Sequence, residues 1–350
     1  MVLTSTILVI VVIIIIALVF DFTNGFHDSA NAIATVVSTK VLSPRRAVVF
    51  AAFFNFVAAF GFGVAVASTI SKIIKLDYLE AEDLESLIPY IILGGLIGAI
   101  AWNIITWYLG LPTSSSHALI GGLMGSGISA VGIMAIKFST VQLVVLFMFL
   151  SPLIGLVCGF LFMSALMWIC RSKSQAKVDR QFKKLSLISA GAYCFSHGTN
   201  DAQKTIGIIT PLLFSAGYFK GHGYAAVDPG NLPVPWWVII AAYSTIAIGT
   251  LAGGWRIVKT MGNRITTLRP VHGFAAQTGG ATTIIMASLA GIPVSTTHVI
   301  TASIMGVGAT KRASAVRWGV ARSIVWVWIL TIPASALIGF ISFSLINLLL

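Results

Sequence analysis

The segment Gly110-Leu-Pro-Thr-Ser-Ser-Ser-His117 interrupts a long apolar stretch, and Gly291-Ile-Pro-Val-Ser-Thr-Thr-His298 repeats its pattern in the second half of the chain. Apolar stretches of helical length flank both segments. Proline fits the start of a helix, and serine or threonine caps it, so the free N–H groups of the second helix point into the turn. The pattern therefore predicts two helical hairpins with polar tips.

A second pair of motifs carries an aspartate into equally apolar surroundings. Phe22-Thr-Asn-Gly-Phe-His-Asp28 resembles Phe195-Ser-His-Gly-Thr-Asn-Asp201, and the order of the two motifs is the same in both halves of the chain. An ionised carboxylate costs roughly 2.5 to 3.5 kcal/mol at mid-membrane on insertion scales. This cost indicates that Asp28 and Asp201 have a function.

The composition is that of a polytopic membrane protein. Of the 350 residues, 57% are hydrophobic and only 9% are charged, far from the values of a soluble domain. No basic residue precedes the apolar run 7–20, and Asp21 follows it directly, so this run is interpreted as a retained first span rather than a secretory signal. We expect a multi-pass protein of an inner or plasma membrane, in direct contact with the lipid bilayer.

The net charge of +12 reports membrane topology. Seventeen of the 22 basic residues fall in four short stretches, which the positive-inside rule assigns to the cytoplasm, whereas five of the ten acidic residues lie in Asp77–Glu85, interpreted as an external loop. Nucleic acid is therefore excluded as a partner. The four basic stretches are Lys40–Arg46, Arg171–Lys184, Arg256–Arg269 and Lys311–Arg322.

These charges place the N-terminus outside and predict two halves of opposite orientation. The first hairpin enters from outside and the second from inside; a full crossing by the first would put its tip in the cytoplasm, where no basic residue lies. The predicted fold is an all-α polytopic membrane protein of two inverted-topology repeats, with broken helices and two re-entrant helical hairpins. Its parts are a first repeat, 1–170, a basic cytoplasmic connection, 171–184, and a second repeat, 185–350. This is a common plan of secondary transporters, which bind substrate and coupling ions at the repeat interface.

The hairpin tips are candidate anion sites, because a helix N-terminus binds anions such as phosphate. For any single hydroxyl, bonding to a backbone carbonyl is an equal alternative, but two facing tips favour a binding role. The candidate hydroxyl groups belong to Thr113, Ser114, Ser115, Ser116, Ser295, Thr296 and Thr297.

Two carboxylates at an anion site require a cation. Unit charges 4 Å apart repel by about 4 kcal/mol at an effective dielectric of 20, so Na⁺ or a proton must bind with the anion. We expect Na⁺ at Asp28 and Asp201. Asp21 is either a further cation ligand or a group at the water interface. The amides of Asn24, Asn31 and Asn200 offer oxygens to Na⁺ and donors to an oxyanion.

Further polar residues break or follow the symmetry. Lys204 stands where the first motif has Asn31, and three residues from Asp201 it either pairs with this aspartate or touches the anion. His117 and His298 follow the hydroxyl runs at matched positions, and Gln277 precedes the second tip. These last three are expected to support the site, by packing or as ligands.

The motifs closely resemble those of the inorganic phosphate transporter family called PiT, the solute carriers that move phosphate with Na⁺ or H⁺. The resemblance rests on Asn24-Gly-Phe-His-Asp-Ser-Ala-Asn31, on His197-Gly-Thr-Asn-Asp-Ala-Gln-Lys204 and on the two hairpin tips, and it covers nearly the whole chain. It implies phosphate as substrate, a homodimer, no cofactor, and Asp28 and Asp201 as the signature aspartates. The short connection Arg171–Lys184 departs from relatives with a long cytoplasmic loop.

The expected function is therefore import of inorganic phosphate by cation symport, with Na⁺ favoured over H⁺ and an alternating-access site between the hairpin tips and two broken helices that carry Asp28 and Asp201. Three alternatives differ in substrate or mechanism. Sulfate is the nearest rival anion, and an anion channel would use the tips as a filter. An intramembrane hydrolase using Ser114 or Ser115 with His117 lacks an oriented third group, so we do not expect an enzyme.

Overall fold

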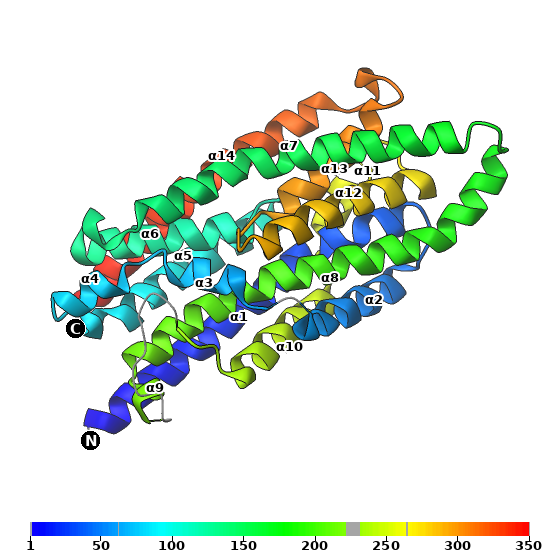
Figure 1. Cartoon of the computed structure of the whole chain (residues 1–350). Coiled ribbons are helices and arrows are strands. Elements are labelled where there is room, and N and C mark those ends of the chain that lie inside the picture. Colours follow the sequence, from blue (N-terminus) through cyan, green and yellow to red (C-terminus); the bar gives the residue numbers. More distant parts are fainter. Residues whose placement is uncertain (1, 62, 222–231, 264, 350) are drawn as a thin grey trace.

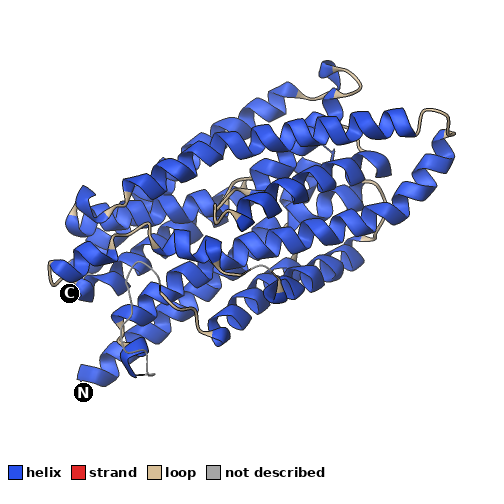
Figure 2. Ribbon diagram, viewed as in Figure 1, coloured by secondary structure: helices blue, strands red, loops and turns tan. Residues whose placement is uncertain are grey.

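The computed structural model describes residues 2–61, 63–221, 232–263 and 265–349, which are helical almost throughout and contain no β-strand (Figure 1, Figure 2). Arg264 of the third basic stretch lies outside the described residues. The predicted all-α architecture is confirmed. The α-helices are α1 (Val2–Ser38), α2 (Pro44–Val57), α3 (Ala65–Ser71), α4 (Leu76–Ala81), α5 (Ile88–Tyr108), α6 (Ser115–Val131), α7 (Phe138–Ile169), α8 (Gln175–Ser215), α9 (Tyr218–Gly221), α10 (Trp236–Ala252), α11 (Trp255–Asn263), α12 (Pro270–Leu289), α13 (Thr296–Ala309) and α14 (Trp318–Asn347).

Both aspartate motifs lie inside long unbroken helices, so the helix breaks predicted beside Asp28 and Asp201 are wrong. Helix α1 has 37 residues and α8 has 41. A polar side chain does not interrupt a helix, whose backbone hydrogen bonds stay internal. The glycines of the motifs serve close helix crossings instead. A Cβ at Gly25 would collide with the carbonyl oxygen of Ile246 in α10, and one at Gly198 with that of Asn55 in α2.

Two helical hairpins, α5/α6 and α12/α13, form where the sequence predicts them. Each first arm ends at a glycine with positive φ, +67° at Gly110 and +69° at Gly291, a conformation that glycine adopts without strain. The amide of Leu111 then donates to the carbonyl of Thr106 at 2.9 Å, and the second hairpin ends in the same way. This pattern satisfies the last carbonyls of a helix and frees the chain to turn.

The hairpins enter from opposite ends of the molecule and meet tip to tip (Figure 1). At the meeting point the Ser116 hydroxyl donates to the carbonyl of Val294 at 3.2 Å. The second arms pack outward, α6 against α14 and α13 against α7, while α8 packs against α12 and α1 against α10. The tips are therefore enclosed by helices from both halves of the chain.

The breaks in the fold occur in the helices that hold the tips. Helices α10 and α11 are bent by 73° at a break that contains Gly253, where φ is +71°. Thr260 of α11 donates to the carbonyl of Gly110 at 3.1 Å, and Thr69 of α3 donates to that of Gly291 at 2.6 Å. Each tip glycine is thus held by a threonine from the other half of the chain.

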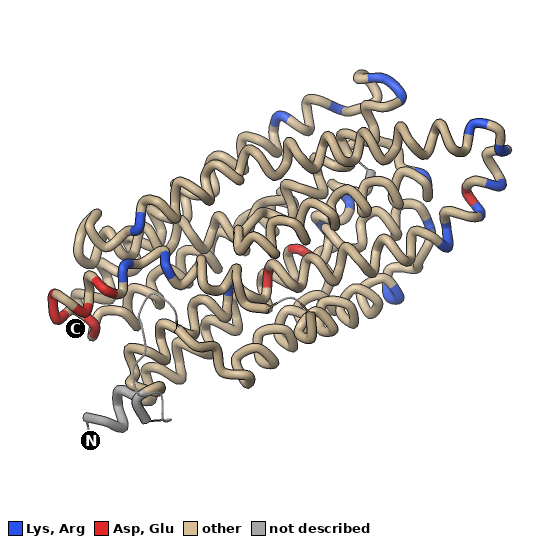
Figure 3. Tube along the Cα trace, in the orientation of Figure 1, with Lys and Arg blue, Asp and Glu red and all other residues tan. Residues whose placement is uncertain are grey.

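The acidic stretch of the chain and most of its basic residues lie toward opposite ends of the molecule (Figure 3). The acidic stretch Asp77–Glu85 lies at one end and the basic stretch Arg171–Lys184 at the other. Most of the second stretch is helical, because α8 already begins at Gln175. It contains neither glycine nor proline, and its Lys, Arg and Gln residues are good helix formers.

The surface between these ends is apolar. Four helices among the described residues are long and apolar enough to cross a membrane, namely α1, α5, α7 and α14. They expose large hydrophobic side chains such as Ile15, Leu146 and Leu337, which suits contact with lipid chains. Many polar side chains within the apolar section, Asp28 and Asp201 among them, are buried inside the molecule.

Candidate functional site

A stripe of buried polar side chains runs along one face of α1. Asp21, Asn24, Asp28 and Asn31 follow one another at spacings of three, four and three residues, and each is at most 1% exposed. This spacing places side chains on a single helical face. The face points into the molecule, toward the two hairpin tips and α8.

Asp28 accepts hydrogen bonds from both hairpin tips. Its Oδ2 accepts from the Ser115 hydroxyl of the first tip at 3.3 Å and from Thr296 of the second at 3.5 Å. Its Oδ1 accepts from the Thr297 hydroxyl at 3.2 Å and lies 2.9 Å from His27 Nδ1. The tips therefore already hold one anionic group, the carboxylate of the protein itself.

Asp201 enters the same cluster from α8. Its Oδ1 lies 2.6 Å from Lys204 Nζ, in an ion pair whose side chains are both fully buried. Its Oδ2 lies 3.7 Å from His197 Nε2, which in turn lies 4.0 Å from Asp28 Oδ2. Ligand atoms of Asp28, His197 and Asp201 all lie within 4.8 Å of one another, a grouping that can hold a metal ion.

Asn24 joins the two carboxylates. In the amide orientation that satisfies its surroundings, Nδ2 donates to Asp201 Oδ2 at 3.2 Å and to Asp28 Oδ2 at 3.3 Å. The same nitrogen lies 2.6 Å from Ser115 Oγ. One neutral amide thus offsets part of the repulsion between two buried carboxylates, and it ties them to the first hairpin tip.

His197 faces both carboxylates with its second ring nitrogen. The Asn55 amide donates to Thr250 Oγ1 at 2.9 Å, which orients its oxygen toward His197 Nδ1 at 3.2 Å. Nδ1 therefore carries a proton, and the second ring nitrogen, Nε2, faces the two carboxylates. Such an arrangement is repulsive unless a proton or a metal cation lies between these groups.

The start of each second hairpin arm has the geometry of an anion site. Ser114 accepts at 3.2 Å from the amide of His117, and Ser295 accepts at 3.2 Å from that of His298. These caps satisfy the third amide of each helix and leave the first two without an acceptor inside the helix. The two helix starts therefore converge on the cluster with free N–H groups and positive dipole ends.

Three further candidate residues differ in how many hydrogen-bond partners they have. Thr113 bonds to Thr106 at 2.9 Å and lies 3.3 Å from His27 Nε2. Asn31 donates to Thr297 at 2.8 Å, and its own oxygen has no partner. Both carboxylate oxygens of Asp21 are buried without a hydrogen-bond partner.

Two candidates serve neighbouring contacts. Asn200 donates to Ser288 at 3.0 Å and to the carbonyl of Ile292 at 3.4 Å, so its amide supports the second tip from α8. Gln277 accepts from Ser189 at 3.0 Å, between α12 and α8. Neither contact involves the two carboxylates.

The histidines of the two tips pack against each other. The rings of His117 and His298 lie edge to face with centroids 4.8 Å apart, and His298 stacks on Trp328 of α14 at 3.8 Å. The Trp328 indole donates to the carbonyl of Pro112 at 3.1 Å. Trp328 therefore contacts both hairpin tips, which no sequence motif had indicated.

His197 is the second residue that the sequence reasoning undervalued. When the two aspartate motifs are aligned, His197 matches Asn24. Both side chains lie beside Asp28 and Asp201. The repeat itself therefore contained the signal. Asn55 and Thr106, which orient His197 and contact His27, belong to neither motif and carried no comparable signal.

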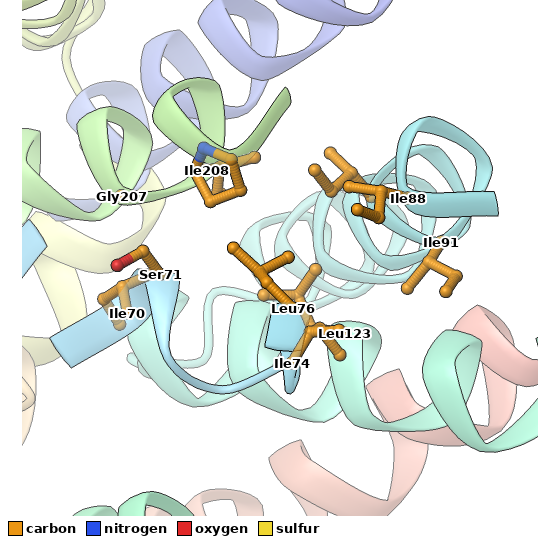
Figure 4. A pocket seen from close by; sticks show the side chains of 11 residues that line it. Ile70, Ser71, Ile74, Leu76, Ile88, Ile91, Leu123, Gly207 and Ile208 are labelled. Atoms are coloured by element: carbon orange, nitrogen blue, oxygen red, sulfur yellow. The ribbon is translucent and has the colours of Figure 1, made fainter. Parts of the chain in front are cut away.

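An apolar cavity lies apart from the cluster, between α3, α5, α6 and α8 (Figure 4). Its volume is about 20 Å³, room for about one water molecule. Isoleucines such as Ile70, Ile88 and Ile91 line it, and Ser71 is the polar side chain among them. It offers an anion almost no hydrogen bonds, so the buried polar cluster is the better candidate for a functional site among the described residues.

Comparison with known proteins identifies the class. The phosphate transporter family matches residues 24–339, which include both aspartate motifs and both hairpin tips. The chain belongs to this family. Its membership, predicted from the motifs, is confirmed, and it makes the chain a multi-pass membrane protein of phosphate transport rather than an enzyme.

Relatives and a solved structure in the phosphate transporter family extend over almost the whole chain. A probable low-affinity inorganic phosphate transporter of Rhizobium meliloti is 49% identical over 93% of this chain and 92% of its own length. One of Bacillus subtilis is 43% identical over 99% and 98%. A solved structure described as the sodium-dependent phosphate transporter superposes with a TM-score of 0.85 at 25% identity, over 98% of this chain and 100% of that one.

Proposed function

We propose that the protein imports inorganic phosphate together with Na⁺ through the buried polar cluster. The observation that carries this proposal is the convergence of two carboxylates and a ring nitrogen of His197 within 4.8 Å of one another, next to two hairpin tips whose helix starts suit an anion. The two carboxylates require a cation, and the hairpin tips favour an oxyanion. The name of the solved relative, a sodium-dependent transporter, supports Na⁺.

Phosphate would bind at the helix starts of α6 and α13. The free backbone N–H groups of the two helices, and the hydroxyls of Ser115, Thr296 and Thr297, would supply its hydrogen bonds. Thr113, Ser114, Ser116 and Ser295 would shape the tips, Asn24 and Asn200 would add amide donors, and Lys204 would add positive charge. A protonated phosphate oxygen can also donate to a carboxylate, which sulfate at neutral pH cannot do.

Na⁺ would bind between Asp28 and Asp201, where Asn24 and Asn31 offer further oxygens. A hard cation prefers such oxygen ligands over histidine nitrogen, so His197 would border the ion rather than ligate it. Asp21, whose carboxylate is buried and unpartnered two helical turns from Asp28, would hold a second cation.

The buried charges also suggest the number of cations. With all three ionised, Asp21, Asp28 and Asp201 would carry three negative charges, of which Lys204 would offset one. Two Na⁺ ions would neutralise the remaining pair before any phosphate binds. Because buried unpaired charge costs several kcal/mol, we propose that at least two Na⁺ move with each phosphate.

Coupling would follow from competition for the tip hydroxyls. Asp28 engages Ser115, Thr296 and Thr297 and so occupies donors that phosphate needs. A bound Na⁺ would neutralise this carboxylate and draw it away from the hydroxyls. Phosphate would then find both the donors and a site without net negative charge, so neither ligand would bind well alone.

The two halves would act as inverted repeats, 1–170 and 185–350, that expose the site to each side in turn. The matched contacts of Thr69 and Thr260 with opposite tip glycines support this division. The hairpins would be re-entrant, with the N-terminus outside and the protein a homodimer in the cell membrane. His117 and His298 would hold the two tips together by packing, and Gln277 would hold α12 against α8.

Uptake of radiolabelled phosphate into proteoliposomes tests this proposal. An inward Na⁺ gradient should drive accumulation above equilibrium, and a pH gradient alone should not; the reverse result would establish the proton-coupled alternative. Excess sulfate should not compete. Phosphate entry that equilibrates but never accumulates under either gradient would indicate an anion channel and contradict the symporter.

A further inference from the structure

An apolar groove opens on the outer surface between α7 and α14, with α13 as its floor. Its volume is about 720 Å³, within the range of pockets that enclose a small molecule. The floor is formed by Ala302 and Met305, each 5% exposed, whereas the walls expose Leu153, Val325 and Ile329 by 41 to 57%. It is a hollow in the part of the surface that faces lipid.

The groove is about as long as one leaflet of the hydrocarbon core is thick. Along α14 it extends from Trp318, at the basic end of the molecule, to Ile329, which is about 16 Å at the helical rise. This is about half of a hydrocarbon core of roughly 30 Å. Trp318 and Trp326, both more than half exposed, lie along its rim. Trp318 directly follows Arg317 of the basic stretch, and tryptophan at such a position favours the membrane interface.

Arg322 gives the groove a charge preference. It lines the groove, is exposed, and makes no ion pair among the described residues. No acidic side chain lines the groove. Lys311, Arg312 and Arg317 precede it in the same basic stretch. A basic side chain above an apolar groove matches an acyl chain joined to an anionic headgroup.

We propose that this groove binds an acyl chain of an anionic phospholipid, whose headgroup phosphate pairs with Arg322. The consequence for transport depends on Trp328, which lines the groove on one side and contacts both hairpin tips on the other through His298 and Pro112. A chain in the groove packs against this indole and stabilises its contacts with the tips. This link rests on the proposed transport function, whereas lipid binding does not.

Lipid retention by the purified protein tests the binding step. The full-length protein in detergent is given phosphatidylglycerol or phosphatidylcholine, and bound lipid is counted by native mass spectrometry. We expect one phosphatidylglycerol to be retained about fivefold more strongly than phosphatidylcholine. Arg322→Gln should abolish this preference, and Arg180→Gln, an exposed arginine outside the groove, should keep it. Equal retention of both lipids, or no effect of Arg322→Gln, overturns the proposal.

A second pair of variants tests the groove itself. Val325→Trp fills it and should lower retention of both lipids, while Val145→Trp, at an exposed valine of α7 outside the groove, should not. If Val325→Trp dissociates a dimer and leaves lipid retention unchanged, the groove is an interface between copies and the lipid proposal is wrong.

The link to transport is tested in vesicles. Phosphatidylglycerol should raise the phosphate uptake rate of the unmodified protein but not that of Arg322→Gln; equal stimulation of both proteins also contradicts the lipid proposal. Retention without any uptake would contradict the transport function alone.

Discussion

Asp28 is the residue on which the proposed coupling depends, because its carboxylate contacts both hairpin tips and faces Asp201 across Asn24. Asp28→Asn keeps the shape and removes the charge. We expect Na⁺-driven phosphate accumulation in proteoliposomes to fall to the level of protein-free vesicles, and Asp201→Asn to have the same effect. Asp179→Asn, which removes a peripheral ion pair with Arg269, should accumulate phosphate normally. Wild-type accumulation by Asp28→Asn would refute the coupling scheme.

Lys204 has a role in stability that can be separated from transport. Its ion pair with Asp201 is fully buried, and removal of one partner from such a pair costs about 3 to 5 kcal/mol. Lys204→Met should therefore lower the unfolding temperature in detergent by several degrees. Adding Asp201→Asn removes the unpaired charge and should restore most of the loss without restoring transport. A Lys204→Met protein as stable as the parent would show that Asp201 is not ionised there.

His197 distinguishes the two possible coupling ions. Its Nε2 faces both carboxylates, whereas His27 faces Asp28 alone, so His197 Nε2 is the ring nitrogen at which a proton could replace a Na⁺ held between the two aspartates. His197→Gln preserves a polar side chain but cannot be protonated at neutral pH. If Na⁺ is the coupling ion, we expect Na⁺-driven uptake within about tenfold of the parent. The proton would be favoured as the coupling ion by two results together: His197→Gln loses all uptake, and a pH gradient drives uptake by the parent protein.

At the scale of the elements, close helix packing positions the hairpin arms. A Cβ at Gly125 of α6 would collide with the carbonyl oxygen of Ala336 in α14, so the two helices would have to separate. Overpacking of this kind costs typically 1 to 3 kcal/mol. Gly125→Ala should therefore lower the unfolding temperature in detergent. Gly319→Ala is the matched control, because a Cβ there meets no atom within 4 Å; equal stability of the two variants would show that α6 and α14 do not pack this closely.

Some of these elements, such as the hairpin tips, could be predicted from the sequence, and others, such as the unbroken α1 and α8, could not. The hairpin tips could be predicted, since a glycine with positive φ and a following proline leave the chain few other conformations at Gly110 and Gly291. The convergence of Asp28 and Asp201 followed from the repeated motifs. The continuity of α1 and α8 could not, because a glycine that permits a close helix crossing looks in sequence like one that ends a helix. Trp328 lies in no repeated motif, and its contact with both tips depends entirely on how α14 packs.

At the scale of the whole molecule, the distribution of charge predicts the orientation in the membrane. The acidic end with Asp77–Glu85 and the basic end with Arg171–Lys184 (Figure 3) predict, by the positive-inside rule, that the basic end faces the cytoplasm. The hairpins enter from these two ends, so in this orientation each tip would belong to the side from which its hairpin comes. In the proposed import cycle, the first hairpin would open toward the outside while the second stays closed, and the second would then open toward the inside while the first closes.

This orientation can be tested by labelling in intact cells. The three free cysteines, Cys158, Cys170 and Cys194, are first replaced by serine or alanine in a variant that still takes up phosphate. Single cysteines are then placed at the exposed positions Glu82, at the acidic end, and Lys177, at the basic end. A membrane-impermeant maleimide should label Glu82→Cys in intact cells and Lys177→Cys only after the cells are broken. Labelling of Lys177→Cys in intact cells would invert the predicted topology, and each hairpin would then serve the opposite side of the membrane.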